Sequence, residues 1–398
     1  MKYVVVLADG MADIPIEELG GKTPLEYAAT PSMDALASGG MMGMAKTVPV
    51  SMKPGSDVAN LAVMGYNPQC CYSGRSPLEA LSVGVSMKDT DVVFRCNIVT
   101  LSEDEPYEDK IILDHSSGEI STQDADILMD AVRDAFQNET FMFYTGTSYR
   151  HITVWDNGEI LDLEPPHDHL GQVIGQYLPE NTLFRDMMKK SFDVLNNHPL
   201  NVKRAAEGKN KANSLWFWGA GTKPSLQNFR EKTGLNGTMI SAVDLLKGIA
   251  VGAGMKIVEV EGATGSLDTN YLGKAQAAVK TLLEDNQDFV YIHVEAPDEM
   301  GHQGNLHHKV QSIEEIDKNI IAVVKQALDE AKEDYRILVL PDHPTPICMR
   351  THTADPVPYV LFDSTDIKNN NTTFSENNAK QTGIYQPEGY RLMEMLIK

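Results

Sequence analysis

Cysteine is scarce in this chain of 398 residues, and none of its cysteines forms a Cys-x-x-Cys pair. The four are Cys70, Cys71, Cys96 and Cys348. They are too few for a disulfide scaffold in a chain of this length. We therefore expect a protein of a reducing compartment, the cytoplasm.

Long hydrophobic runs are also missing. The apolar start of the chain, Met1–Ala8, is short and is followed by Asp9, so we expect neither a signal peptide nor a membrane span there. No other stretch approaches the roughly eighteen uninterrupted apolar residues of a membrane helix. The sequence predicts a soluble protein.

Basic residues are outnumbered by acidic ones. The chain has 34 Lys and Arg against 56 Asp and Glu, a net charge of −22. This balance argues against nucleic acid or an anionic membrane as a partner. A small anionic substrate would need a local cationic pocket, and acidity by itself is commonly a solubility feature.

Three common catalytic motifs are absent. Gly21-Lys22-Thr23 resembles the end of a P-loop, but the first glycine would fall at Ile16. Gly219-Ala220-Gly221 follows a predicted strand, Leu215–Trp218, yet the spaced third glycine of a dinucleotide-binding loop is missing. No Gly-x-Ser-x-Gly elbow is present. The sequence therefore supports neither ATP nor NAD binding.

What is present is the pattern of a two-domain α/β protein. Apolar residues make up 42% and charged residues 23%, and the length predicts two domains. Strands alternate with helices, one expected from Pro31 to Gly39 after an N-cap at Thr30 and another at about 312–332. This order predicts a mostly parallel sheet covered by helices on both faces. The predicted strands are Tyr3–Ala8, Phe289–Val294, Arg336–Leu340 and Pro358–Phe362.

The middle of the chain differs in character. It has acidic turns and a polar run at 203–213, and its strands Thr140–Tyr144 and His151–Trp155 look less deeply buried. We interpret it as a smaller α+β domain, residues 81–229, inserted into a domain formed by residues 1–80 and 230–398.

Metal-binding side chains follow several predicted strands. Asp298 and His302 lie in a loop after one strand, and Asp342-His343 follows another directly. Asp9 ends the first strand and His352 lies close behind Asp342-His343. A single Asp/His pair would be weak evidence, but strand ends of one parallel sheet face the same crevice. Carboxylate and imidazole suit Mn²⁺, Zn²⁺ or Mg²⁺, and paired metals are common in phosphoryl transfer.

Ser56 lies in a Pro/Gly turn, Lys53–Asn60, that leads into an apolar helix. One interpretation is an N-cap serine. The other is a nucleophile, because a helix N-terminus favours a developing phosphoserine and a metal can activate a bound hydroxyl.

A series of motifs occurs in a recognisable order along nearly the whole chain. The chain resembles the archaeal-type, 2,3-bisphosphoglycerate-independent phosphoglycerate mutases of the alkaline phosphatase superfamily. The motifs are Asp9-Gly10, Gly20–Leu25, Pro54–Asn60, Gly74–Ala80, Phe94–Asn97, Tyr149–His151, Ser241–Leu246, Asp268–Tyr271, Pro297–His302 and Pro341–His343.

The resemblance implies an alkaline-phosphatase-like fold and assigns roles to the candidate residues. One divalent metal ion would be held by Asp9, Ser56, Asp342 and His343, and a second by Asp298, His302 and His352. Ser56 would be the serine that is transiently phosphorylated, without 2,3-bisphosphoglycerate as cofactor. Arg95 and Arg150 are the best candidates for binding a small anionic phosphorylated substrate. Weaker candidates are Arg75, Arg204, His151 and Lys247.

The reaction expected from this resemblance is the isomerisation of 3-phosphoglycerate to 2-phosphoglycerate. The glycerate must be retained while phosphoserine exists, so the inserted domain is the expected lid. Ser214–Gly221 departs from the family pattern and leaves the phosphoryl acceptor open. The alternatives are a phosphotransferase acting on another small hydroxyl compound such as homoserine, a phosphatase or phosphodiesterase, and a non-catalytic metal-binding protein.

Overall fold

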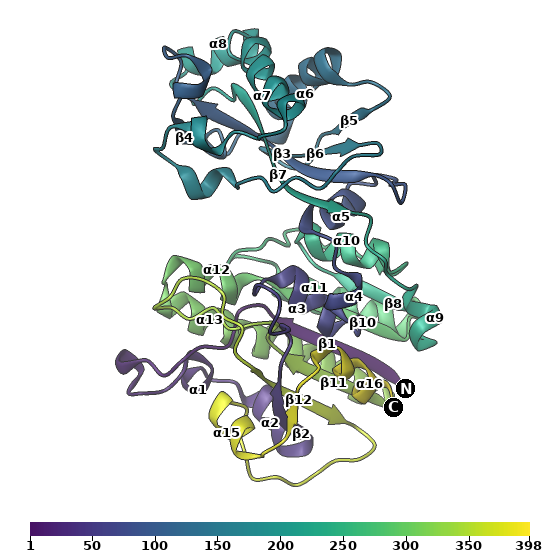
Figure 1. Ribbon diagram of the computed structural model, residues 1–398. Helices are drawn as coiled ribbons and strands as arrows, with labels where there is room; N and C mark the ends of the chain where they lie inside the picture. Colours follow the sequence, from purple (N-terminus) through teal and green to yellow (C-terminus); the bar gives the residue numbers. More distant parts are fainter. The chain divides into compact units, whose positions relative to one another are not determined.

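The computed structural model describes all residues, 1–398, in two compact units (Figure 1). The core unit comprises residues 1–72 and 225–398, and the inserted unit residues 73–224. The sequence placed these boundaries at 80/81 and 229/230. The first boundary differs because helix α5 (Arg75–Ser82) packs on strands of the inserted unit, and the second lies five residues earlier than predicted.

The core unit is built on one eight-stranded sheet in the order β13-β2-β12-β11-β1-β10-β8-β9. Every neighbouring pair is parallel except those of β12, which runs antiparallel to β11 and to β2. The predicted mostly parallel α/β sheet is confirmed, although the strand predicted at 358–362 reverses direction. The strands are β1 (Lys2–Ala8), β2 (Met41–Ala45), β8 (Gly237–Ile240), β9 (Lys256–Ile257), β10 (Phe289–Val294), β11 (Tyr335–Leu340), β12 (Val357–Asp363) and β13 (Tyr385–Gln386).

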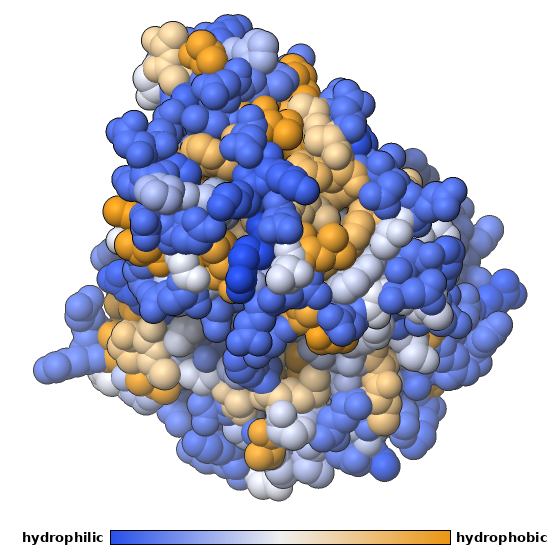
Figure 2. All heavy atoms as spheres, turned by 45° about the horizontal axis from the view of Figure 1, so that its top comes forward, coloured by the Kyte–Doolittle hydropathy of each residue, from blue (hydrophilic) through white to orange (hydrophobic).

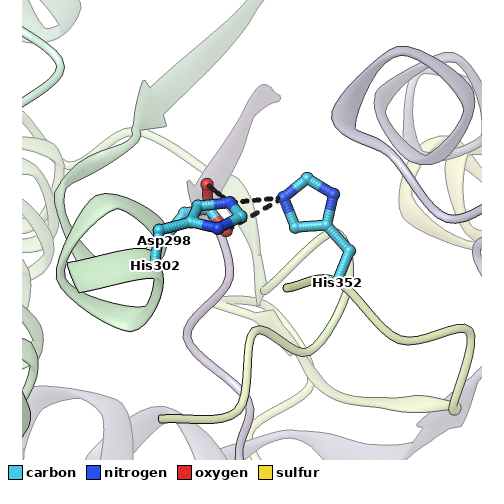
Figure 3. A group of neighbouring side chains, drawn as sticks. All are labelled: Asp298, His302 and His352. Atoms are coloured by element: carbon cyan, nitrogen blue, oxygen red, sulfur yellow. Dashed lines mark hydrogen bonds and ion pairs between the residues drawn. The ribbon is translucent and has the colours of Figure 1, made fainter. Parts of the chain in front are cut away.

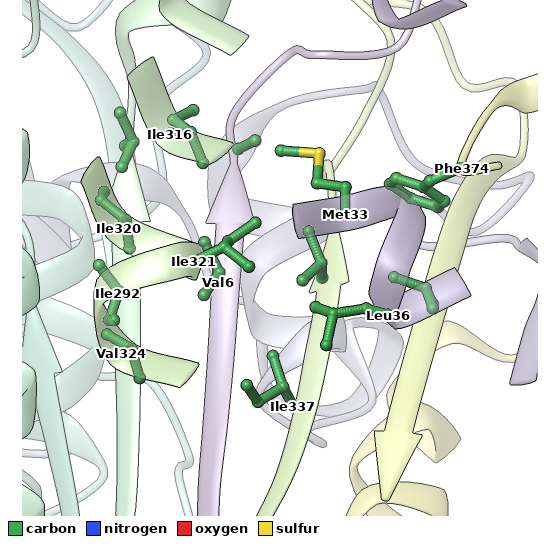
Figure 4. Packing of buried hydrophobic residues seen from close by; sticks show 14 of the residues in the cluster. Val6, Met33, Leu36, Ile292, Ile316, Ile320, Ile321, Val324, Ile337 and Phe374 are labelled. Atoms are coloured by element: carbon green, nitrogen blue, oxygen red, sulfur yellow. The ribbon is translucent and has the colours of Figure 1, made fainter. Parts of the chain in front are cut away.

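Helices cover both faces of this sheet. On one face, α2 (Pro31–Gly39) and the long helical segment 306–331 pack on Val6, Ile292 and Ile337 (Figure 4). Helix α11 (Tyr271–Leu283) contributes to the same apolar cluster. Burial of each such aliphatic side chain contributes roughly 1.5–3 kcal/mol. On the other face lies α3 (Ser56–Val63), which Tyr291 of β10 reaches through a hydrogen bond.

Two helical segments differ from the sequence prediction. Residues expected to form a loop make α12 (Ala296–Gln303), which has a proline in its first turn and ends at Gly304 in the left-handed conformation. The helix predicted from about 312 begins earlier, as α13 (Leu306–Ile316), because the Asn305 side chain caps it by accepting the N–H of His308. It continues through a π-helical turn (Asp317–Ile321) into α14 (Ala322–Ala331).

The inserted unit is an antiparallel α+β domain around β3 (Val92–Leu101). Helices α6 (Thr122–Phe136) and α7 (Thr182–Leu195) bury an apolar cluster with one face of its sheet. Contrary to the sequence prediction, the middle of β6 is buried, because α5 and its neighbours cover the second face. The other strands are β4 (Ile112–Asp114), β5 (Phe141–Tyr144), β6 (Arg150–Trp155) and β7 (Ser214–Thr222).

The surface reflects the charged composition. On the face drawn in Figure 2, hydrophilic residues predominate and hydrophobic ones form smaller groups among them. None of the helices has both the length and the apolar character that crossing a bilayer requires.

Candidate metal centre

The predicted metal ligands of the core unit come from neighbouring strand ends. Strand β1 lies between β10 and β11 and is parallel to both, so all three end at the same edge. Asp9 follows β1, Asp342 and His343 follow β11, and Asp298 lies on α12 just after β10. This is the edge at which open α/β sheets bind ligands.

One group of side chains consists of Asp298, His302 and His352 (Figure 3). Asp298 and His302 are four residues apart on α12 and so share one face of the helix. The Nε2 atoms of His302 and His352 lie 2.9 Å apart. They are 3.3 Å and 3.4 Å from the two carboxylate oxygens of Asp298. The two imidazoles and the carboxylate therefore face one small volume.

A second group adjoins the first and contains Asp9, Asp298 and His343, whose candidate ligand atoms all lie within 4.8 Å of one another. His343 Nε2 is 3.7 Å from Asp9 Oδ1 and 3.3 Å from Asp342 Oδ2. Asp298 belongs to both groups, so the structure brings all the predicted ligands of the core unit together.

Ser56 joins this second group. Its Oγ lies 3.1 Å from His343 Nε2. The N-cap of α3 is Gly55, and Ser56 is the first helical residue, with no side-chain capping hydrogen bond. The N-cap interpretation of Ser56 was therefore wrong, and its hydroxyl is directed at the candidate metal ligand His343.

Buried carboxylates lie close together at this site and would be stabilised by a positive charge. Burial, reinforced by the nearby Asp342 and Asp298, raises the pKa of Asp9 well above its usual value. Asp9 Oδ1 is buried and has no hydrogen-bond partner. Burial alone would also raise the pKa of Asp298, but hydrogen bonds from His302 and His352 hold it well below the usual range. Clustered carboxylates with an unpartnered oxygen fit divalent cations.

Asn60 and Thr345 hold the site and were not singled out from the sequence. Asn60 Nδ2 donates to Asp342 Oδ2 at 2.9 Å and to the backbone oxygen of Ser56 at 2.8 Å. Thr345 Oγ1 donates to Asp298 Oδ1. In the sequence, Asn60 could have been noticed as the one amide among the apolar residues 58–63 of α3.

The loop carrying Asp342 and His343 is anchored by a buried ion pair. Lys309 Nζ lies 2.9 Å from Asp13 Oδ2, both side chains are fully buried, and the same ammonium donates to the backbone oxygen of Thr345 at 2.8 Å. Asp13 also contacts this loop directly, because its Oδ2 accepts the N–H of Ile347 at 3.1 Å.

Replacing Lys309 with alanine is expected to lower the free energy of unfolding by about 3–5 kcal/mol, because it leaves the buried Asp13 carboxylate unpaired. Urea denaturation measures the loss. Lys325→Ala is the matched control, since its pair with Asp329 is partly exposed and is worth about 1 kcal/mol or less. Equal losses for the two variants would show that the buried pair does not anchor the loop.

Arginines gather on the inserted unit around one acid. Glu79 of α5 lies 2.8 Å from Arg75 Nε and 2.8 Å from Arg95 Nε. Arg95 also stacks over Trp218 at 4.8 Å. Burial, with the charges of Arg75 and Arg150, lowers the pKa of Arg95 to about 10, although Glu79 opposes the shift. Arg95 is buried beside the Trp218 ring, and these side chains form a cationic cluster.

The three remaining candidates have other partners. His151 is fully buried, its Nδ1 accepts the N–H of Gly146, and burial lowers its pKa to about 3, so it carries no charge for binding an anion. Arg204 is buried against Asp124 at 2.8 Å, and Lys247 Nζ pairs with Glu259 at 2.8 Å. The substrate-binding roles of these three side chains stay predictions.

Carboxylates, imidazoles and a serine hydroxyl lie together at the strand ends of an α/β sheet. This arrangement is typical of metal-dependent enzymes. A model of the family described as 2,3-bisphosphoglycerate-independent phosphoglycerate mutase matches residues 37–201. The chain is 48% identical to a probable mutase of this kind from Geobacter sulfurreducens and 47% identical to one from Methanosarcina barkeri, each over 100% of both chains. This chain belongs to the 2,3-bisphosphoglycerate-independent phosphoglycerate mutase family.

Solved structures share the fold of this chain. A protein from Pyrococcus horikoshii is 30% identical, with a TM-score of 0.82 covering 100% of this chain and 96% of that one. The cofactor-independent phosphoglycerate mutase of Thermoplasma acidophilum, 24% identical, shares the fold with a TM-score of 0.67 over 100% of this chain and 99% of that one.

Proposed function

We propose that this chain interconverts 3-phosphoglycerate and 2-phosphoglycerate through a phosphoserine at Ser56, in the cytoplasm and without 2,3-bisphosphoglycerate. The observation that carries the proposal is the Ser56 hydroxyl, 3.1 Å from His343 Nε2 and beside the buried carboxylates. The names of the full-length relatives support the substrate.

Two divalent ions, Mn²⁺, Mg²⁺ or Zn²⁺, complete the proposed site. The unpartnered Oδ1 of Asp9 and the raised pKa of its carboxyl support cation binding there. When bound, the ions acidify the serine hydroxyl and neutralise charge on the phosphoryl oxygens. One ion would be held by Asp9, Ser56, Asp342 and His343, and the other by Asp298, His302 and His352.

The chemistry at Ser56 requires two transfers. The Ser56 hydroxyl loses its proton as its Oγ attacks phosphorus, the bond from phosphorus to the glycerate oxygen breaks, and that oxygen takes up a proton. The other glycerate hydroxyl then loses its proton as it attacks the phosphorus of phosphoserine, the bond from phosphorus to Ser56 Oγ breaks, and Oγ is reprotonated. The start of α3 favours the phosphoserine charge, because helix N-termini carry partial positive charge.

The cationic cluster of the inserted unit is proposed to bind the substrate's anionic groups. Arg75 Nε donates a hydrogen bond to Glu79, and Arg95 Nε lies 2.8 Å from the other oxygen of the same carboxylate as an ion pair. Arg150 is exposed and lies 5.4 Å from the Tyr149 ring centroid. Retention of glycerate requires exclusion of water, so the inserted unit is proposed to act as the lid.

Arg150→Ala is expected to raise the ratio of phosphate release to mutase turnover, because glycerate is then held less firmly while phosphoserine exists. Parallel assays of inorganic phosphate and 2-phosphoglycerate measure this ratio. Arg185→Ala, in the same unit and bonded to the backbone oxygen of Pro179, is the control. Equal loss of both activities, or of neither, would show that Arg150 does not retain the substrate.

The proposed substrate is tested directly by supplying 3-phosphoglycerate and Mn²⁺ without 2,3-bisphosphoglycerate. The expected result is formation of 2-phosphoglycerate, which is measured in an assay coupled to enolase and pyruvate kinase. Phosphate release from many phospho-compounds without isomerisation would identify a phosphatase instead. Phosphorylation of homoserine by a phosphoryl donor, without mutase turnover, would identify the alternative acceptor.

A further inference from the structure

His293 is a fully buried imidazole between the metal centre and the core, and no role was assigned to it above. It lies in β10 and is flanked by apolar neighbours in the sequence. Its Nε2 is 2.8 Å from Asp9 Oδ2, and its Nδ1 is 3.1 Å from Ser241 Oγ. Each ring nitrogen therefore faces one partner.

The hydrogen-bond directions follow from these partners. Ser241 Oγ accepts the backbone N–H of Val243 at 3.0 Å, so its hydroxyl hydrogen can be donated to His293 Nδ1. When the proposed ion is bound, Asp9 is ionised and only accepts hydrogen bonds, so the nitrogen facing it must carry the hydrogen. Together these contacts select the neutral tautomer in which His293 Nε2–H donates to Asp9.

The backbone of His293 is fixed independently of its ring. Lys274 of α11 is fully buried, and its Nζ donates to the His293 backbone oxygen at 2.9 Å. Strand β10 is also paired with β1, with His293 opposite Leu7. The imidazole is therefore held from the strand, from a helix and from the turn at Ser241.

The two carboxylate oxygens of Asp9 therefore have different surroundings. Oδ2 accepts from His293, whereas Oδ1 is buried, has no hydrogen-bond partner and lies 3.7 Å from His343 Nε2. Rotation of the carboxylate would break the His293 bond. Oδ1 is thus the oxygen presented to the proposed ion.

We propose that His293 is a positioning residue that fixes the orientation of Asp9 for metal binding, and that Ser241 selects the tautomer required for this. The proposal rests on the proposed metal site. Removing such a supporting hydrogen bond commonly weakens metal binding by about 10–100-fold. A side chain that merely filled the core would affect stability and leave metal affinity unchanged.

Calorimetric titration of the chelator-treated chain with Mn²⁺ tests the proposal. Ser241→Ala is expected to weaken one of two binding steps about tenfold or more and leave the other within twofold. Ser312→Ala is the control, because its hydroxyl is also buried but donates to the Lys309 backbone oxygen. His293→Gln, which keeps a side-chain N–H donor, should bind more tightly at the affected step than His293→Leu. Binding by Ser241→Ala that matches Ser312→Ala would overturn the proposal.

Nitrogen-15 spectra of the histidine rings supply a second readout. With diamagnetic Zn²⁺, His293 is expected to carry its hydrogen on Nε2, and Ser241→Ala should populate the other tautomer as well. A hydrogen on Nδ1 in the unmodified chain would overturn the assignment. If the unmodified chain bound no metal at all, the proposed function would fail, and the ring spectrum at high pH would still decide whether His293 donates to Asp9.

Discussion

Ser56→Ala should lose mutase turnover by at least about a thousandfold, because no other group can replace the serine oxygen that accepts the phosphoryl group. Stability should change little, since Ser56 is not the cap of α3 and makes no capping bond. The coupled assay with 3-phosphoglycerate measures turnover, and the thermal midpoint measures stability. Incorporation of phosphate into the protein from labelled substrate should disappear with the hydroxyl.

Ser51 provides the comparison for this variant. It lies in the same segment before α3, is exposed, and its Oγ only accepts a hydrogen bond from Gln69. Ser51→Ala should retain full turnover and phosphate labelling. Turnover of Ser56→Ala within tenfold of the parent would mean that another group receives the phosphoryl group.

Metal removal is expected to have the second largest effect. A chelator should abolish turnover, and it should also lower the thermal midpoint, because the buried carboxylates then lack their counter-charge. An ion present at one hundred times its dissociation constant stabilises the folded state by about 2.7 kcal/mol. Differential scanning calorimetry with and without added Mn²⁺ measures this difference.

Adding the metal back distinguishes loss of the ions from damage to the protein. Adding Mn²⁺ back should recover both turnover and the thermal midpoint, whereas Ca²⁺, which prefers more oxygen ligands and longer bonds, should recover less turnover. Full turnover in excess chelator, with metal content checked by mass spectrometry, would contradict the metal-dependent mechanism.

The sequence was informative where physical rules are local. An apolar run followed by an acid predicted β1 and Asp9, and a run ending in Asp342-His343 predicted β11, both as the structure has them. The parallel sheet then predicted that these strand ends meet, and the structure brings them together. The identity of the bound ions stays a prediction.

The features that the sequence did not predict depend on interactions that the local sequence pattern does not encode. Strand β12 looks like its parallel neighbours in sequence, since direction depends on the connection and not on composition. His293 resembles an isolated polar residue in a buried strand until Asp9 and Ser241 are placed beside it. Similarly, Arg204 reads as a free cation until Asp124, eighty positions earlier, is seen to bind it.

The boundary at α5 illustrates a related limit. The sequence analysis placed residues 75–80 in the first domain. In the structure Glu79 of α5 pairs with Arg95 on β3, so α5 belongs with the strands of the inserted unit. Side-chain pairing across the fold decided this boundary, and no composition change marks it.

The pairing of β1 has a consequence for biosynthesis. Its partners β10 and β11 begin at Phe289 and Tyr335, so the first strand emerges from the ribosome long before either neighbour exists. The inserted unit, residues 73–224, is synthesised in the interval and has its own core with which to fold. On the proposed ligand assignment, one ion could bind only after His343 has been translated and the other only after His352. A nascent chain would therefore not acquire the proposed ions early, and metal capture would report that the slow, long-range closure of the sheet is finished.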